Sequence, residues 1–256
     1  MRRRRLSVAV GTAMLMLLGA CGSAGANGAS PRPRRTSASP SPSPTVHGRV
    51  ATFAGPPRSG DGPSGSLRST GTTAVALTFD DGPNPTWTPR ILALLRKYHI
   101  HATFCVIGMY AKQYPQLIRQ IVEQGHTLCN HSWDHDEFLY QKSTAHVRSE
   151  MTRTNAAIRR AVPGAAIRYY RQPGGNWSGR IVKQAHALGM TPLHWSVDPS
   201  DWSRPPVHSI IATVKSTTRK GSIILDHDGG GDRSHTYAAL RVLLPYLKRK
   251  YDLIRL

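Results

Sequence analysis

Seven short apolar segments alternate with amphipathic stretches over residues 73–256, and this alternation constrains the fold more than any other feature. Stretches such as 88–98 and 114–125 have the spacing of amphipathic helices. We therefore predict an α/β domain of parallel strands with crossover helices, as a barrel or an open sheet. The expected strands are residues 74–79, 102–107, 126–130, 167–171, 191–197, 222–226 and 251–255.

Residues 1–20 have the layout of an export signal. An arginine cluster precedes a short apolar run and then small residues. The apolar run is shorter than a transmembrane helix requires. We expect the chain to leave the cytoplasm.

Cys21 directly follows this segment, and "LGAC" (residues 18–21) resembles the lipobox of bacterial lipoproteins. In such proteins, cleavage exposes a cysteine that then carries lipid. An ordinary secretory signal that happens to contain a cysteine is the alternative reading. We predict that Cys21 is lipidated, which would anchor the protein to the outer face of the cell membrane, within reach of the envelope.

Residues 21–72 comprise Cys21 and a predicted tether that is rich in Pro, Ser and Gly. The tether has almost no side chains that could be buried in a core. A flexible tether of this length has an r.m.s. span of roughly 40 Å. The catalytic domain is therefore predicted to occupy residues 73–256.

The chain is strongly basic, with 34 Lys and Arg against 14 Asp and Glu. Residues 73–256 keep 24 basic and 13 acidic residues, a net charge of +11. The basic residues are scattered and no nucleic-acid recognition motif is visible, so we expect no nucleic-acid partner. An anionic cell envelope is the expected neighbour of the domain. We expect the protein to be a monomer.

Reactive polar residues follow five of the predicted strands. Because the carboxyl ends of parallel strands meet at one edge, these residues should form one ring. Taken singly, each has a plainer explanation: a turn, a solvated histidine pair, a loop, or a helix start capped by Ser200 or Asp201. The residues of the ring are Asp80, Asp81, His131, Arg171, Asp198 and His227.

The chemistry of the set favours a hydrolytic metal site. Two histidines and one carboxylate are a usual catalytic zinc ligand set, which Asp81, His131 and His135 would supply. Asp80 is then suited to accept a proton from water, and His227 to donate one to the leaving group.

Five ordered motifs resemble those of the NodB-homology polysaccharide deacetylases, carbohydrate esterase family 4. The resemblance covers essentially all of residues 73–256. The motifs are "TFDDGP" (78–83), "HSWDH" (131–135), "RQPGG" (171–175), "DPSDW" (198–202) and "LDH" (225–227).

The resemblance implies a distorted (β/α)7 barrel and a divalent metal, usually zinc. The same ligand set also tolerates cobalt, nickel or manganese. It further implies that Asp80 is the base, with Asp81, His131 and His135 as metal ligands.

Four further roles follow from the same resemblance. Arg171 would hold Asp80 ionised and oriented, because a positive neighbour favours a carboxylate. Asp198 would orient His227 and favour its protonated form. Trp202 and Leu225 would line the substrate groove and the pocket for the acetyl methyl group.

Gly174 departs from the family pattern, which usually has an aromatic residue at this position. A glycine can still donate its backbone N–H to a developing oxyanion, but it lacks the aromatic wall and has more backbone freedom. We expect activity to be retained and substrate preference to change at this edge of the site.

Cys105 and Cys129 lie on the second and third predicted strands. They could be buried apolar residues. Because the domain is expected to be exported and the two strands to be neighbours, we predict a disulfide.

Three functions fit these observations. The first is a metal-dependent deacetylase of polysaccharides that contain N-acetylglucosamine, such as peptidoglycan or chitin oligomers. The second is an O-deacetylase of acetylated xylan-type polymers. The third, a non-catalytic envelope-binding lipoprotein, is the least favoured because all the expected reactive residues are present.

Overall fold

The computed structural model describes residues 58–256 of the 256-residue chain. The predicted export signal (1–20), the predicted lipidation site at Cys21 and most of the predicted tether lie outside the described residues. None of the helices in residues 58–256 is long and apolar enough to cross a membrane.

Seven strands form within the described residues. They are β1 (Val75–Asp80), β2 (Thr103–Val106), β3 (Thr127–Asn130), β4 (Tyr169–Tyr170), β5 (Thr191–Pro192), β6 (Ile223–His227) and β7 (Leu253–Ile254). Five lie inside the segments predicted from the sequence, and β1 and β6 each extend one residue beyond the predicted end.

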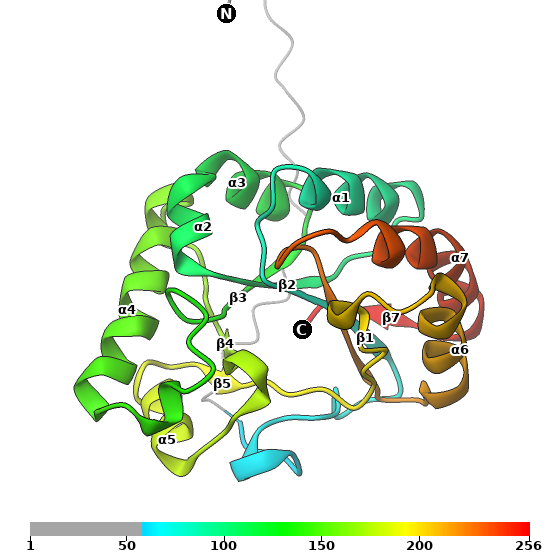
Figure 1. Cartoon of the computed structure of the whole chain (residues 1–256). Helices are drawn as coiled ribbons and strands as arrows, with labels where there is room; N and C mark the ends of the chain where they lie inside the picture. Colours follow the sequence, from blue (N-terminus) through cyan, green and yellow to red (C-terminus); the bar gives the residue numbers. More distant parts are fainter. Residues whose placement is uncertain (1–57) are drawn as a thin grey trace, which may run out of the picture. The chain divides into compact units, whose positions relative to one another are not determined.

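Helices lie around the strands (Figure 1). They are α1 (Trp87–Lys97), α2 (Gly108–Gln113), α3 (Pro115–Glu123), α4 (Thr144–Ala161), α5 (Gly179–Ala187), α6 (Val207–Thr217) and α7 (Ser234–Lys250). Local signals in the sequence account for several helix ends. The Ser143 and Ser178 side chains cap α4 and α5, and Pro115 opens α3.

The strands form one parallel sheet in the order β5-β4-β3-β2-β1-β6, with β7 paired to the start of β1. The segment after β5 returns to β6 through a bridge between Val197 and Ile224. The sheet is therefore curled into a distorted barrel of parallel strands, and the predicted fold class is confirmed. Asp80 at the end of β1 lies opposite Cys105 of β2 and His227 of β6.

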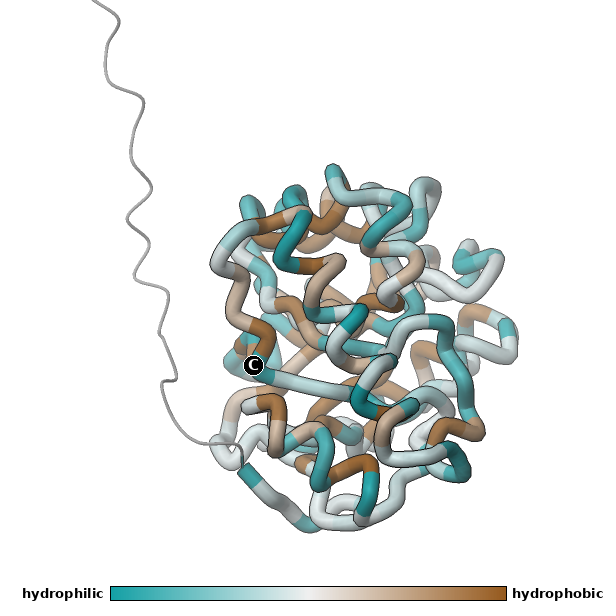
Figure 2. The backbone as a smooth tube through the Cα atoms, turned by 90° about the vertical axis from the view of Figure 1, so that its left-hand side faces the viewer, coloured by the Kyte–Doolittle hydropathy of each residue, from teal (hydrophilic) through white to brown (hydrophobic). Residues whose placement is uncertain are grey.

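Alternation along β1 separates two sides of the sheet. Val75, Leu77 and Phe79 belong to the large core between sheet and helices. Ala76 belongs to a smaller cluster on the other side, so Thr78 and Asp80 also face that inner side. In Figure 2, hydrophilic residues recur along the outer turns of the domain. The inner side of β1 thus runs from an apolar base to a charged end.

The domain begins earlier than the sequence analysis predicts. Leu67 is buried and bridges Leu193, and Ser69 bridges Ser222. Ser66 and Thr70 are also buried. The predicted boundary at residue 72 is therefore too late, because this polar stretch holds one apolar residue that fills the base of the barrel.

A disulfide joins Cys105 and Cys129, which lie directly opposite each other on β2 and β3. Both cysteines are fully buried in the inner apolar cluster. The bond therefore links two central strands beneath the charged end of the barrel.

We predict that this disulfide stabilises the domain. In a Cys21→Ser background, thiol titration of the denatured chain should find no free thiol before reduction. Replacing Cys105 and Cys129 together by Ala should lower the free energy of unfolding by about 3 kcal/mol, because the bond closes a loop with a sequence separation of 24. Two free thiols in the unreduced chain would contradict the prediction.

Candidate active site

Asp80 is held by a buried arginine. Arg171 is fully buried, and its Nη1 donates to Asp80 Oδ1 at 2.7 Å and to Thr78 Oγ1 at 2.8 Å. Its Nε and Nη2 donate to the backbone oxygens of Leu193 and His194. The guanidinium is therefore fixed from three sides, and it fixes one oxygen of Asp80.

Asp81, His131 and His135 form a cluster beside this pair. Asp81 Oδ1 lies 3.4 Å from His131 Nε2 and 3.2 Å from His135 Nε2. One ligand atom from each residue lies within 4.8 Å of the others. Asp80 Oδ2, the oxygen that Arg171 does not hold, lies 3.6 Å from His131 Nε2.

Tight loops, not helices, position the cluster. Asp81 and His135 both have positive φ, at 71° and 65°, which turns each away from the direction of its preceding strand or loop. His131 Nδ1 donates to the backbone oxygen of Arg171 at 2.9 Å, which leaves Nε2 as the acceptor nitrogen. The backbone N–H of His135 donates to Ser132 Oγ.

The cluster fits a divalent cation. Asp81 Oδ1 is buried and has no hydrogen-bond partner among the described residues, which is costly unless a cation completes it. Burial alone would raise the pKa of Asp81, but the close approach of His131 and the nearby imidazoles of His227 and His135 hold that pKa well below its ordinary value. One carboxylate and two imidazole nitrogens are a common zinc ligand set.

Asp201, and not Asp198, is the partner of His227. His227 Nδ1 donates to Asp201 Oδ1 at 2.6 Å, and the backbone N–H of His227 donates to Asp201 Oδ2 at 3.0 Å. Asp198 instead accepts from the backbone N–H of Ser200. The assignment of Asp198 to this role is therefore wrong. Ser200 has a φ of 54°, and this turn directs the next residue, Asp201, toward the end of β6.

The other predicted site residues lie around this centre. Leu225 is buried on β6, two residues before His227 and on the same side of the strand. Trp202 is 55% exposed beside Asp201. Gly174 is exposed and has a φ of 62° in the turn after Arg171, a conformation that suits glycine.

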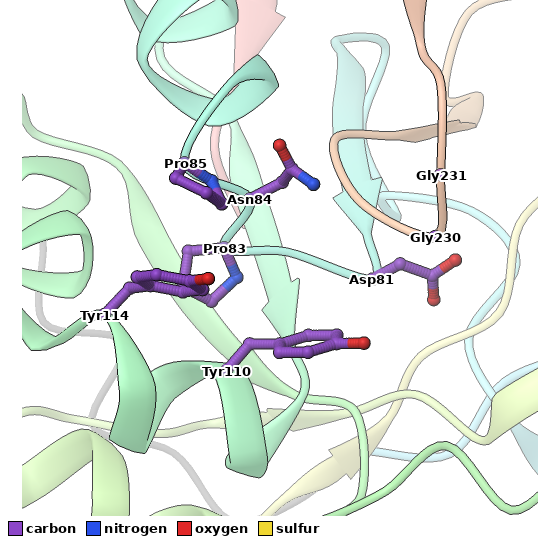
Figure 3. Close-up of a pocket in the computed structure, with 8 residues that line it drawn as sticks. All are labelled: Asp81, Pro83, Asn84, Pro85, Tyr110, Tyr114, Gly230 and Gly231. Atoms are coloured by element: carbon purple, nitrogen blue, oxygen red, sulfur yellow. The ribbon is translucent and has the colours of Figure 1, made fainter. Parts of the chain in front are cut away.

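A pocket of about 190 Å³ adjoins Asp81 (Figure 3). Its residues come from the turn after β1, from α2 and the residue that follows it, and from the glycine-rich loop after β6. At Gly230 a side chain would overlap Asp81 Oδ2, so glycine permits this close approach. The pocket is lined by Asp81, Pro83, Asn84, Pro85, Tyr110, Tyr114, Gly230 and Gly231.

Two buried acids near the site were not singled out in the sequence. Burial and the Asp201 charge raise the pKa of Asp226 well above its ordinary value. Burial raises the pKa of Asp228 to about 7, although a hydrogen bond from Thr88 opposes the shift. The backbone N–H of Asp228 also donates to the backbone oxygen of Asp80, which ties β6 to the end of β1. Asp226 is the middle residue of the "LDH" motif but was given no role, and Asp228 lies just outside that motif.

Comparisons with known proteins agree with this geometry. A polysaccharide deacetylase family model matches residues 68–193. A chitooligosaccharide deacetylase of Sinorhizobium fredii is 43% identical over 196 residues, 73% of this chain and 91% of the relative. A peptidoglycan-N-acetylglucosamine deacetylase of Bacillus cereus is 38% identical over 178 residues, 69% of this chain and 82% of the relative.

A solved structure has a similar fold. The family 4 carbohydrate esterase from Streptomyces lividans, in complex with acetate, has a TM-score of 0.65 and 33% identity, covering 72% of this chain and 91% of its own. Together, these matches show that the chain belongs to the polysaccharide deacetylase family.

The Asp201 contact predicts how His227 titrates. Burial alone would lower the pKa of His227, but the charge and hydrogen bond of Asp201 raise it to about 9 from an ordinary value of 6.5. The pair thus stabilises the fold fully below pH 6.5, and this contribution is lost as the pH rises through about 9. Asp201→Asn should move the pKa of His227 down toward or below 6.5, as measured by NMR titration of the imidazole.

Asp198→Asn is the matched control, because it removes the neighbouring carboxylate that does not bond the ring. It should leave the pKa of His227 close to that of the parent protein. A larger drop in the Asp198→Asn protein than in the Asp201→Asn protein would contradict the assignment of Asp201.

Proposed function

We propose that this protein is a metal-dependent N-deacetylase of polysaccharides that contain N-acetylglucosamine. The observation that carries the proposal is the placement of three groups at one edge of the barrel: the Asp81–His131–His135 cluster, the Asp80–Arg171 pair and the His227–Asp201 pair. The relatives named as chitooligosaccharide and peptidoglycan deacetylases support this choice of substrate class.

Asp81, His131 and His135 would hold the divalent cation, with zinc the expected ion. Such an ion lowers the pKa of water and polarises an acyl oxygen, which brings amide hydrolysis within reach of neutral pH. The protein holds the ligands ready by keeping Asp81 ionised and by fixing His131 through the Arg171 backbone.

Asp80 would take the proton of the attacking water. Arg171 occupies Asp80 Oδ1, so Oδ2, which faces the ligand cluster, is the oxygen that accepts. Because the guanidinium is fixed by four hydrogen bonds, the carboxylate does not reorient between turnovers.

His227 would donate a proton to the leaving nitrogen. Its Nδ1 is held by Asp201, so Nε2 would be the donor atom. Water would give one proton to Asp80 and add its oxygen to the acetyl carbon. The carbon–nitrogen bond would break as His227 gives its proton to the nitrogen, so the products are acetate and a free amine.

The glycan would lie across the pocket beside Asp81. Tyr110 and Tyr114 present aromatic rings there (Figure 3), and aromatic rings pack well against the apolar faces of sugars. Exposed Trp202 adds a further ring next to Asp201. Buried Leu225 would line the pocket for the acetyl methyl group.

Export and anchoring complete the proposal. A signal at residues 1–20, a lipid on Cys21 and a tether would hold the domain at the outer face of the membrane. A lipid-anchored enzyme reaches only the nearby envelope, so cell-wall glycan is the proposed substrate. The domain would act there as a monomer.

The central prediction concerns acetate release. The protein should release acetate from N-acetylglucosamine oligomers or peptidoglycan, lose this activity on chelation and regain it with zinc. Asp80→Asn should lower kcat by at least about 100-fold, because general-base catalysis contributes that much or more.

Asp61→Asn is the control, because Asp61 is an exposed acid outside all five motifs, and this variant should keep full activity. Release from acetylated xylan in place of the N-acetylated polymers would make the protein an O-deacetylase. No release from any of these polymers with zinc bound would contradict a catalytic role and favour an envelope-binding protein.

Anchoring is tested separately. Cells that express the full chain and are fed a labelled fatty acid should incorporate label into the protein, and Cys21→Ala should abolish the incorporation. Equal labelling of the parent and Cys21→Ala proteins would rule out lipid attachment at this residue.

A further inference from the structure

Glu137 stands beside Gly174, where the sequence motif lacks a side chain. A Cβ added at Gly174 would lie 3.2 Å from Glu137 Cγ and 3.3 Å from Glu137 Cδ. The Asn176 side chain donates to the backbone oxygen of Glu137 at 3.2 Å, which ties the two loops together. The stem of Glu137 therefore occupies space that a side chain at residue 174 would need.

Glu137 follows the cluster residue His135 by two positions in the same loop. Glu137 is exposed, and no basic side chain in residues 58–256 lies within ion-pairing distance of it. Its neighbour Asp136, in contrast, pairs with Lys142 at 3.7 Å.

This lone carboxylate differs in sign from the domain that carries it. Residues 73–256 have a net charge of +11, so the domain as a whole repels a cationic sugar. Screening limits that repulsion beyond about 8 Å at physiological ionic strength, so a cationic group bound closer than this to a carboxylate is influenced more by that carboxylate than by distant basic residues. A cationic group bound beside the Gly174 turn would lie next to Glu137.

We propose that Glu137 is a specificity-determining residue that contacts the protonated amine of a glucosamine next to the acetylated sugar. The inference rests on the proposed function, because deacetylation is the reaction that converts an acetamide into such an amine. Glu137 would then favour glycans that have already lost some acetyl groups. Successive removals along one chain would be the result.

The test compares two probes on the full chain loaded with zinc. One is a fully acetylated N-acetylglucosamine oligomer, and the other is the same oligomer with a single free amine beside an acetylated sugar. The measured quantity is the ratio of kcat/KM for the amine-containing probe to kcat/KM for the fully acetylated probe. Glu137→Gln should lower this ratio about threefold, in the range of exposed ion pairs, and Glu137→Lys should lower it further.

Asp136→Asn is the matched control, since it removes the adjacent acid that is already paired with Lys142. It should leave the ratio unchanged. Added salt should lower the ratio in the parent protein but not in Glu137→Gln, because screening acts on the charge pair.

Two outcomes would overturn the inference: an unchanged ratio in Glu137→Lys, or an equal loss on both probes in Glu137→Gln. Binding of the two probes, measured by calorimetry on the same proteins, separates this result from a failure of the proposed function. If the parent protein releases no acetate, the function fails. A charge-dependent preference in binding would still support the role of Glu137, and its absence would still contradict it.

Discussion

The buried ion pair between Arg171 and Asp80 is the contact on which the rest of the site depends. The Arg171 side chain joins the end of β1 to the segment after β5, and the Arg171 backbone oxygen orients His131. A buried charge needs a partner of opposite sign and filled hydrogen bonds, and here both conditions are met. One residue therefore sets the geometry of the proposed proton acceptor and of one proposed metal ligand.

Environment then gives chemically identical carboxyl groups different states. Asp81 is surrounded by imidazoles and stays ionised, whereas burial and the charges of neighbouring acids raise the pKa values of Asp226 and Asp228. Burial alone lowers the pKa of an imidazole, but the charge and hydrogen bond of Asp201 raise the pKa of His227. The barrel edge thus separates groups that hold protons from groups that accept them, as acid–base catalysis requires.

The strand ends could be predicted from the sequence because the apolar segments and the motif order are local signals. Asp80, Asp81, His131 and His227 all lie where the parallel topology places them. The pairing of His227 with Asp201 in place of the predicted Asp198 could not be read from the sequence, since it depends on the left-handed turn at Ser200. The contribution of Leu67 to the barrel base, and the approach of Glu137 to Gly174, depend on long-range packing that no local pattern records.

The pairing of β7 with β1 has a consequence for how the chain folds. β7 meets Val75 and Ala76, and the backbone N–H of Leu256 donates to Thr103, so the first strands of the sheet are completed only by the last residues. Such long-range pairing slows folding. In a chain that emerges N-terminus first, β2 and β3 can pair before β7 is available, so the disulfide between them can form early. The pairing of β7 with β1 then follows.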